Sequence, residues 1–251
     1  SELAEEDLNG TLCPGVRALI IYPMNALAND QMERLRKILS NYPAITYGSY
    51  TGQTKKDKRA ALEEYRKLNN QKQPPKNELI CRDDMIATPP HILITNYAML
   101  EYLMIRPTEN TFFSGDFAKY WKFVVLDEAH VYSGSTGIEV SMLLRRLKSS
   151  LPVKNIQYIL TSATLGNDSQ NAEVADFASR LCNSYFDEMD VVRAIRENPK
   201  HDAISIKHHR FSEYSLLAKA ISDENEQAIR SELKKLNSYQ EDTDLKSIVY
   251  D

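Results

Sequence analysis

The chain has 251 residues, with 31 Lys plus Arg against 35 Asp plus Glu, a formal net charge of -4, three cysteines and only eight glycines. A hydrophobic fraction of 42% beside 26% charged residues is ordinary for a globular protein and excludes the disordered, collagenous and disulfide-framework classes. The longest apolar runs are strand-sized, well short of the roughly 20 residues that span a bilayer. We therefore expect one or two compact domains and no membrane segment.

The N-terminus and the cysteines indicate the compartment. Residues 1–7 are mostly acidic and lack the basic start and apolar core of a secretory signal. Cys13, Cys81 and Cys182 are odd in number and lack metal-ligand spacing, which favours reduced thiols with structural roles. These features predict a cytoplasmic protein.

Short apolar runs alternate with helical patterns along most of the chain. This alternation predicts an α/β fold in which helices cover both faces of a parallel sheet. The predicted helices cover residues 26–40, 55–69, a stretch ending near 104, 136–149, and a segment from the candidate N-cap Asp168 to about 182. The predicted strands cover residues 17–22, 45–50, 91–95, 121–126 and 155–160. In the 136–149 helix, the expected apolar stripe consists of Ile138, Met142, Leu143 and Leu147.

The pattern weakens beyond Pro199, where a short strand at 203–207 and an amphipathic helical stretch at 212–236 are predicted. We therefore expect an α/β domain over residues 1–198 and a mainly helical extension over 199–251. Residues 55–76 hold eight basic and three acidic side chains, whereas residues 222–251 hold eight acidic and four basic ones. Solvated helix faces account for both runs, and the basic run is also a candidate for phosphate contacts.

A pair of carboxylates follows the most continuous apolar strand, where residues 124–130 read VVLDEAH. Parallel sheets bind ligands in the crevice outside the carboxyl ends of their strands. Asp127 could hold Mg²⁺ there, because this ion takes one or two carboxylates beside substrate phosphates. Glu128 could polarise an attacking water as a general base. An Asp-Glu pair alone is more often an ordinary turn cap, so the assignment depends on the other motifs.

Four further segments stand in order at predicted strand ends: residues 22–31 (YPMNALANDQ), Thr51-Gly52, residues 94–97 (ITNY) and residues 162–164 (SAT). Together with residues 127–130, this set resembles the RecA-like motor core of superfamily 2 helicases. Residues 22–31 resemble motif Ia, Thr51-Gly52 motif Ib, and residues 94–97 the nucleic-acid-contact motif that follows. Residues 127–130 resemble motif II, and residues 162–164 resemble motif III. The sequences of residues 22–31, 94–102 and 126–132 resemble those of the YprA-like group of DEAD/DEAH-box helicases. The resemblance covers roughly residues 12–195, and the cysteine cluster found near the C-terminus of that group has no counterpart here.

The resemblance implies ATP-dependent helicase chemistry with ATP and Mg²⁺ as cofactors. In that family Asp127 would coordinate the Mg²⁺ of MgATP and Glu128 would activate the hydrolytic water. His130 would link motif II to motif III, and Ser162 and Thr164 would couple the nucleotide state to domain movement.

The resemblance also implies that single-stranded nucleic acid is the partner, with DNA favoured through the YprA-like group. Hydroxyls, amides and main-chain N–H groups would contact the phosphodiester backbone and so position a strand without reading its sequence. The implied contact residues are Pro23, Asn25, Ala26, Gln31, Thr51, Gly52, Thr95 and Asn96.

None of the eight glycines is followed directly by lysine, so the sequence contains no G-x-x-x-x-G-K-[ST] loop to hold the phosphates. In the family this P-loop precedes motif Ia, and a second RecA-like domain forms the opposite wall of the cleft. We therefore expect part of a first motor domain, incomplete at its N-terminus, that alone neither hydrolyses ATP nor unwinds a duplex. In related folds the P-loop strand lies beside the strand ending in motif III. We thus expect residues 155–160 to lack a partner strand on that edge, and we hypothesise that residues 203–207, a neighbouring chain or a short N-terminal segment covers it.

Two other interpretations stay open. The chain could be a non-catalytic nucleic-acid-binding or scaffold module, or one subunit of a split helicase whose partner supplies the P-loop. The intact Asp127-Glu128 pair favours a hydrolytic motor, whereas the missing loop favours the binding module.

Overall fold

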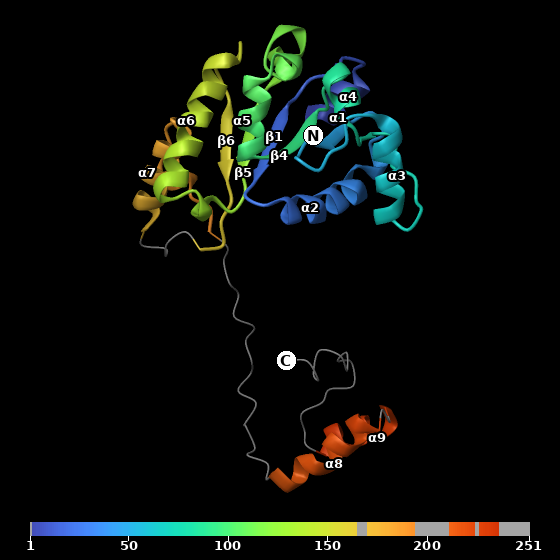
Figure 1. The fold of residues 1–251 in the computed structure, drawn as a ribbon. Coiled ribbons are helices and arrows are strands. Elements are labelled where there is room, and N and C mark those ends of the chain that lie inside the picture. The colour runs from blue at the N-terminus through green and yellow to red at the C-terminus, as the bar shows by residue number, and fades with distance from the viewer. Residues whose placement is uncertain (1, 165–169, 194–210, 224–225, 236–251) are drawn as a thin grey trace. The chain divides into compact units, whose positions relative to one another are not determined.

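The computed structural model describes residues 2–164, 170–193, 211–223 and 226–235 (Figure 1). Contacts divide the chain into two units, residues 1–193 and 194–251, each described here by itself. The predicted strand at 203–207 and the predicted cap Asp168 lie outside the described residues. No helix in the described part of the chain is long and apolar enough to cross a membrane.

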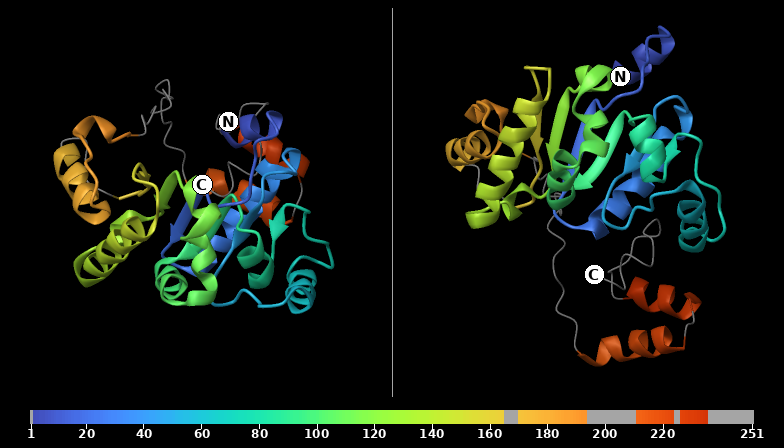
Figure 2. Two further views of the ribbon diagram at one scale, coloured as in Figure 1. Left: turned by 90° about the horizontal axis from the view of Figure 1, so that it is seen from above. Right: turned by 45° about the horizontal axis from the view of Figure 1, so that its top comes forward.

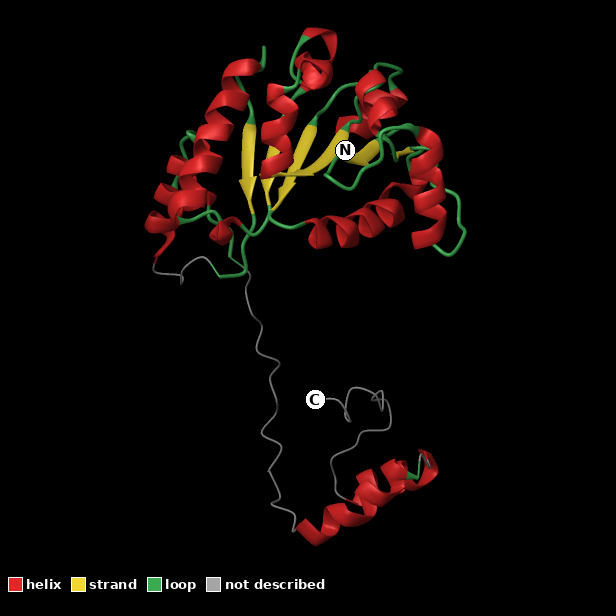
Figure 3. Ribbon diagram, viewed as in Figure 1, coloured by secondary structure: helices red, strands yellow, loops and turns green. Residues whose placement is uncertain are grey.

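The first unit is built on one six-stranded sheet whose strands end at the same edge (Figure 3). Its order is β3-β2-β4-β1-β5-β6, and every neighbouring pair is parallel. The five predicted strands are confirmed to within two residues at each end, and β3 is additional. The bounds are Ala18–Tyr22 for β1, Tyr47–Ser49 for β2, Glu78–Leu79 for β3, Ile92–Asn96 for β4, Phe123–Leu126 for β5 and Gln157–Leu160 for β6.

Helices fill most connections between the strands. Side-chain caps begin two of them, since Asp57 accepts the Ala60 N–H before α3 and Asn96 accepts the Met99 N–H before α5. The α-helices of this unit are α1 (Glu2–Leu8), α2 (Asn25–Ile38), α3 (Lys58–Leu68), α4 (Arg82–Ala87), α5 (Tyr97–Ile105), α6 (Gly134–Ser150) and α7 (Asn171–Cys182). Short 3-10 turns cover Leu39–Asn41, Pro107–Phe112, Gly115–Tyr120, Ala129–Val131 and Glu188–Asp190.

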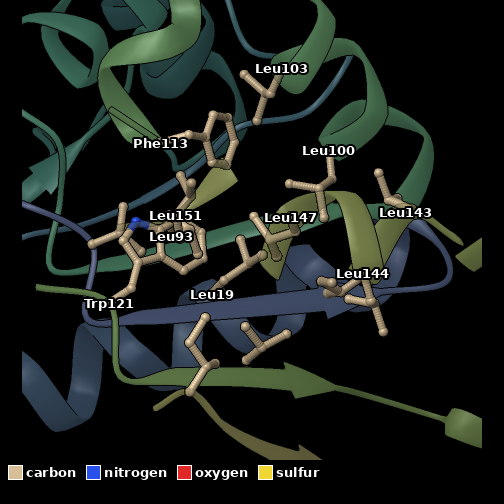
Figure 4. Close-up of a cluster of buried hydrophobic side chains, with 14 of the residues drawn as sticks. Leu19, Leu93, Leu100, Leu103, Phe113, Trp121, Leu143, Leu144, Leu147 and Leu151 are labelled. Carbon is tan, nitrogen blue, oxygen red and sulfur yellow. The ribbon is translucent and has the colours of Figure 1, made fainter. Parts of the chain in front are cut away.

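Alternate strand residues face opposite sides of the sheet and form two cores. The larger core joins the sheet to α5 and α6, and Figure 4 shows Leu19 and Leu93 among leucines of both helices. Trp121 closes one end of this core, and its indole N–H donates to the Phe112 carbonyl at 2.8 Å. Each fully buried leucine stabilises the fold by about 1.5–3 kcal/mol, so this face dominates the stability of the unit.

The smaller core lies on the opposite face, where Tyr22 and Ile94 pack with Met32 of α2. This helix contacts β1, β2 and β4. On β5 and β6 the same face is less covered by the described residues: Val125 is half-buried, and Ile159 is 40% exposed. Described helices therefore lie on both faces, but they cover them unequally (Figure 2).

The predicted apolar stripe of α6 is partly wrong. Ile138 and Met142 are 68% and 57% exposed, whereas Leu143 and Leu147 are buried as expected. The sheet instead selects a stripe that also contains Val140 and Leu144. Apolar residues occupy two adjoining sides of this helix, and its contact with α5 and the sheet decides which side is buried.

Strand β6 is an edge strand. It pairs with β5 on one side, and no described strand pairs with its other side. The described N-terminal residues do not cover this edge, because α1 is tied to Arg17 and Lys122 near the starts of β1 and β5. A cavity of about 740 Å³ adjoins β6 and α7. Among the described residues β6 therefore has an unpaired edge, as expected, and the hypothesised N-terminal cover is not found there. The other hypothesised cover within the chain, residues 203–207, lies outside the described residues.

Buried polar groups anchor the N-terminal segment. Arg17 is only 3% exposed; it donates to Glu6 at 2.8 Å and stacks on the Tyr120 ring at 4.1 Å. His91 is also buried, and its Nδ1 accepts the Thr46 N–H at 2.9 Å, which leaves Nε2 to donate to the Cys13 carbonyl at 3.2 Å. The neutral imidazole thus joins the segment before β1 to the loop before β2.

The second unit contains two described helices, α8 (Phe211–Ser222) and α9 (Glu226–Lys235). They pack against each other. The single helical stretch predicted for 212–236 is therefore two helices.

We predict that His91 makes the unit less stable in mild acid. Burial first, and then the nearby Arg17 charge, lower the pKa of His91 in the folded state. The unfolded state consequently binds the proton more readily, so this contribution is complete above the unfolded pKa, about 6.5, and is lost as the pH falls below it. Urea unfolding should show a smaller loss of stability on acidification for His91→Asn, which does not titrate, than for the unaltered chain. Equal losses would contradict the prediction.

Candidate functional site

Most of the predicted site residues follow directly after parallel strands. Asp127 follows β5, residues 161–164 follow β6, and Pro23 follows β1. Thr51 and Gly52 come just after β2, and Thr95-Asn96 closes β4. Because the strands are parallel, these segments share the edge at which the arrowheads end in Figure 3.

Asp127 accepts a hydrogen bond from a residue that is not among the predicted site residues. The Thr161 hydroxyl donates a short hydrogen bond to Asp127 Oδ1, and the second carboxylate oxygen makes no hydrogen bond to the described residues. The register of β5 and β6 accounts for this contact: Leu126 pairs with Leu160, so the next residues, Asp127 and Thr161, stand side by side. If β5 and β6 had been predicted as neighbouring strands in this register, the contact between Asp127 and Thr161 could have been predicted from the sequence.

Glu128 has an unusual backbone conformation. Its φ of +49° lies in the left-handed region, which costs a non-glycine residue roughly 1–2 kcal/mol. Its Oε2 is buried and makes no hydrogen bond of good geometry, although His130 Nδ1 lies 3.1 Å away. We rank this contact as a weak electrostatic one, since the distance is short but the alignment is poor. The turn therefore fixes the carboxylate while leaving its hydrogen-bonding capacity largely unused.

His130 connects the segments after β5 and β6. Its Nδ1 lies 3.0 Å from Ser162 Oγ, and Ser162 Oγ also accepts the Thr164 N–H at 3.2 Å. The Ala129 N–H donates to the Thr161 carbonyl at 2.8 Å, which adds a main-chain link beside the side-chain one. The structure thus brings Asp127, Glu128, His130 and Ser162 together; Thr164 joins through its main chain, and its own side chain is exposed.

Two tyrosines beneath this edge stay protonated. Burial first, and then the charge of Asp127, raise the pKa of Tyr22 to about 12 and raise that of Tyr132 further. The Tyr132 hydroxyl is buried without a hydrogen-bond partner. The two tyrosines therefore form a neutral surface beneath this edge.

The segment after β1 turns directly into α2. Pro23 is half-buried, Asn25 and Ala26 open the helix, and Gln31 is half-buried in its second turn. This places the predicted contact residues at the helix N-terminus, where main-chain N–H groups favour anions.

Thr51 and Gly52 form a tight turn. The Thr51 N–H donates to Thr54 Oγ1 at 2.9 Å, and the Thr54 hydroxyl donates to the Ser49 carbonyl at 2.8 Å. Thr51 is buried, whereas Gly52 and Gln53 are exposed. The turn therefore presents main chain, and the hydroxyl of Thr51 is used internally by accepting the Gln53 N–H.

Thr95 and Asn96 have structural partners in this conformation. Thr95 is fully buried, and its hydroxyl donates to the Tyr50 carbonyl at 2.7 Å. The Asn96 side chain caps α5. The Thr95 hydroxyl is therefore engaged within the fold and is not available to a phosphate in this conformation.

The basic run at 55–76 is partly neutralised by ion pairs. Lys55 pairs with Glu64 at 3.3 Å, Lys58 with Asp84 at 3.0 Å, and Arg59 with Glu63. These pairs are exposed and each stabilises little. They nevertheless reduce the positive field that the sequence count implied.

The site offers few protein ligands for a metal ion, so a bound ion would take most of its ligands from a substrate and water. No group of three or more His, Cys, Asp or Glu residues in the described ranges could hold a metal ion by itself. Asp127 offers one hard carboxylate oxygen at an open edge, which matches Mg²⁺, an ion that takes few protein ligands and shares the rest with water and phosphates. The residues present therefore fit a magnesium-nucleotide complex.

A protein-family comparison is decisive for identity. The model of the DEAD/DEAH box helicase family matches residues 3–172, well over half of the chain. The chain belongs to this family. The predicted membership of the superfamily 2 helicases is thereby confirmed.

The chain is also similar in sequence to curated proteins that are much longer than it is. It is 28% identical over 280 residues to Druantia protein DruE of Escherichia coli (strain UMEA 4076-1), covering 77% of this chain and 15% of DruE. It is 31% identical over 164 residues to the uncharacterized ATP-dependent helicase YprA of Bacillus subtilis (strain 168), covering 62% of this chain and 18% of YprA. The similarity to YprA bears out the predicted group, and the chain spans less than a fifth of either relative.

Solved structures agree on the fold. The DUF1998 helicase MrfA bound to DNA has a TM-score of 0.50 at 24% identity, covering 73% of this chain and 21% of the MrfA chain. This likeness concerns the fold, and it confirms the RecA-like class.

We predict that Thr161→Val lowers the free energy of unfolding by about 1 kcal/mol at neutral pH, because Asp127 loses its hydrogen-bond donor. Thr164→Val is the matched control: the same exchange falls on an exposed side chain whose hydroxyl has no partner among the described residues. It should change stability by less than about 0.5 kcal/mol. Urea unfolding at one pH measures both variants, and equal effects would refute the role of Thr161.

Proposed function

We propose that this chain is part of the motor of an ATP-dependent helicase or translocase that acts on single-stranded nucleic acid, preferentially DNA, in the cytoplasm. The observation that carries the proposal is the linked group of Asp127, Glu128, His130 and Ser162 at the carboxyl edge of the sheet. A second RecA-like domain and a phosphate-binding loop, in the same chain or a partner, would complete the cleft.

The carboxylates would divide the chemistry between them. Asp127 would hold Mg²⁺ through the oxygen that Thr161 leaves free, and the ion, when bound, neutralises phosphate charge. Glu128 would orient a water and accept its proton, a role supported by its fixed turn and its buried, unbonded Oε2. His130 and Ser162, 3.0 Å apart, would carry a change at one loop to the other.

The nucleic-acid strand would lie along the ends of β1, β2 and β4. Support comes from the exposed main chain of the Gly52 turn and from the N-terminus of α2. Contacts of this kind bind phosphates whatever the base sequence, as translocation requires. The preference for DNA is supported by the kinship with the YprA group, and solved MrfA has DNA bound.

We expect the 251-residue chain to bind fluorescein-labelled oligothymidylate in fluorescence anisotropy, with affinity that falls as salt rises. Each phosphate contact contributes about 0.7 to the slope of log K against log salt for single strands. Labelled oligouridylate tests the preference for DNA, and a duplex of the same length tests the preference for single strands. No binding at low salt would refute the nucleic-acid part of the proposal.

We expect no ATP hydrolysis by the chain alone, because its sequence supplies no P-loop lysine or glycine loop for the phosphates. Phosphate release is measured with and without oligothymidylate, and Glu128→Gln is the control for contaminating enzymes. Release that is stimulated by nucleic acid and abolished by Glu128→Gln would contradict this prediction.

A further inference from the structure

Helix α4 is fastened to the loop that follows β2. The main-chain N–H groups of Arg82 and Asp83 donate to the carbonyls of Lys55 and Lys56 at 2.9 and 3.1 Å. Neither α4 nor these contacts belong to any of the predicted motif segments. The loop between β2 and α3 is thus supported from a segment more than two dozen residues away in sequence.

The Arg82 side chain extends this support to the Gly52 turn. Its Nη2 donates to the carbonyls of Thr51 and Gly52, at 2.9 and 3.2 Å. Its guanidinium also lies over the ring of buried Tyr50, with 5.2 Å from Cζ to the ring centroid. A planar cation that stacks on one face and donates from its edge is held in one orientation.

These contacts engage the main-chain carbonyl groups of the loop but leave one of its N–H groups without a partner among the described residues. Carbonyls of residues 51, 52, 55 and 56 are directed to α4, while the N–H of Gly52, an exposed residue, has no hydrogen-bond partner among the described residues. A main chain whose carbonyls are engaged on one side presents its N–H groups on the other, which is the arrangement that anions seek.

We propose that Arg82 is a positioning residue for single-stranded nucleic acid, holding the 51–54 turn by its carbonyls so that the Gly52 N–H can bind a backbone phosphate. This inference rests on the proposed function and names a residue outside the predicted contact set. Arg82 acts through the turn and does not itself touch the strand.

The test compares the dissociation constant and the salt slope for oligothymidylate in Arg82→Gln, Arg82→Lys and the unaltered full chain. Arg82→Gln should weaken binding about tenfold, as expected for a lost charge-assisted hydrogen bond, with an unchanged salt slope. Arg82→Lys should bind equally weakly, because an ammonium group cannot both stack on Tyr50 and span two carbonyls. Arg180→Gln, which removes an exposed arginine of α7 paired with Asp176, should bind like the unaltered chain.

Unchanged affinity in Arg82→Gln, beside binding by the unaltered chain, would overturn this inference alone. A fall in salt slope by about 0.7, restored by Arg82→Lys, would instead make Arg82 a direct phosphate contact and would also overturn it. Absence of binding by the unaltered chain would overturn the proposed function and this inference together.

A second variant guards against misfolding of Arg82→Gln. Thr54→Val removes the hydroxyl that closes the same turn from its other side. It should weaken binding with an unchanged salt slope, and amide exchange at residues 53 and 54, whose N–H groups are hydrogen-bonded within the turn, should accelerate in both variants. Thr54→Val with unaltered affinity and faster exchange would show that turn geometry does not matter.

Discussion

Parallel strand pairing determines where most of the candidate site residues of this domain lie. The ladder runs one residue beyond the strands, since the Asp127 N–H donates to the Ile21 carbonyl and the Thr161 N–H donates to the Leu126 carbonyl, both at 3.0 Å. Segments far apart in sequence therefore end at one level. The contact between Asp127 and Thr161, and that between His130 and Ser162, both follow from this alignment.

Tyr50 similarly aligns the segments proposed to contact nucleic acid. Its N–H donates to the Ile94 carbonyl at 2.8 Å, its carbonyl accepts the Thr95 hydroxyl, and its own hydroxyl donates to buried Glu109 at 3.0 Å. Its ring carries the guanidinium of Arg82. The turn after β2 and the end of β4 are thus fastened to one buried residue.

The sequence predicted the strands well, because buried parallel strands are continuous apolar runs, and it placed the candidate site segments at the strand ends where the structure has them. It failed where two faces of an element were equally apolar, as in α6, whose burial of Val140 rather than Ile138 depends on a tertiary contact. It also missed Thr161 and Arg82. Neither belongs to a motif, and each acquires its role through a register or a helix placement. Thr95 was expected to face a ligand, but the alternation of β4 turns its side chain inward.

The open side of β6 has a consequence for the behaviour of the purified chain. Its outward N–H and C=O groups, which no strand in the described part of the chain pairs, lie beside Ile159, which is 40% exposed, and another copy could satisfy them as well as water could. Any such association binds the folded form only, so mass action would raise the unfolding midpoint as the protein is concentrated. Stabilities of this chain are therefore comparable only at matched concentrations.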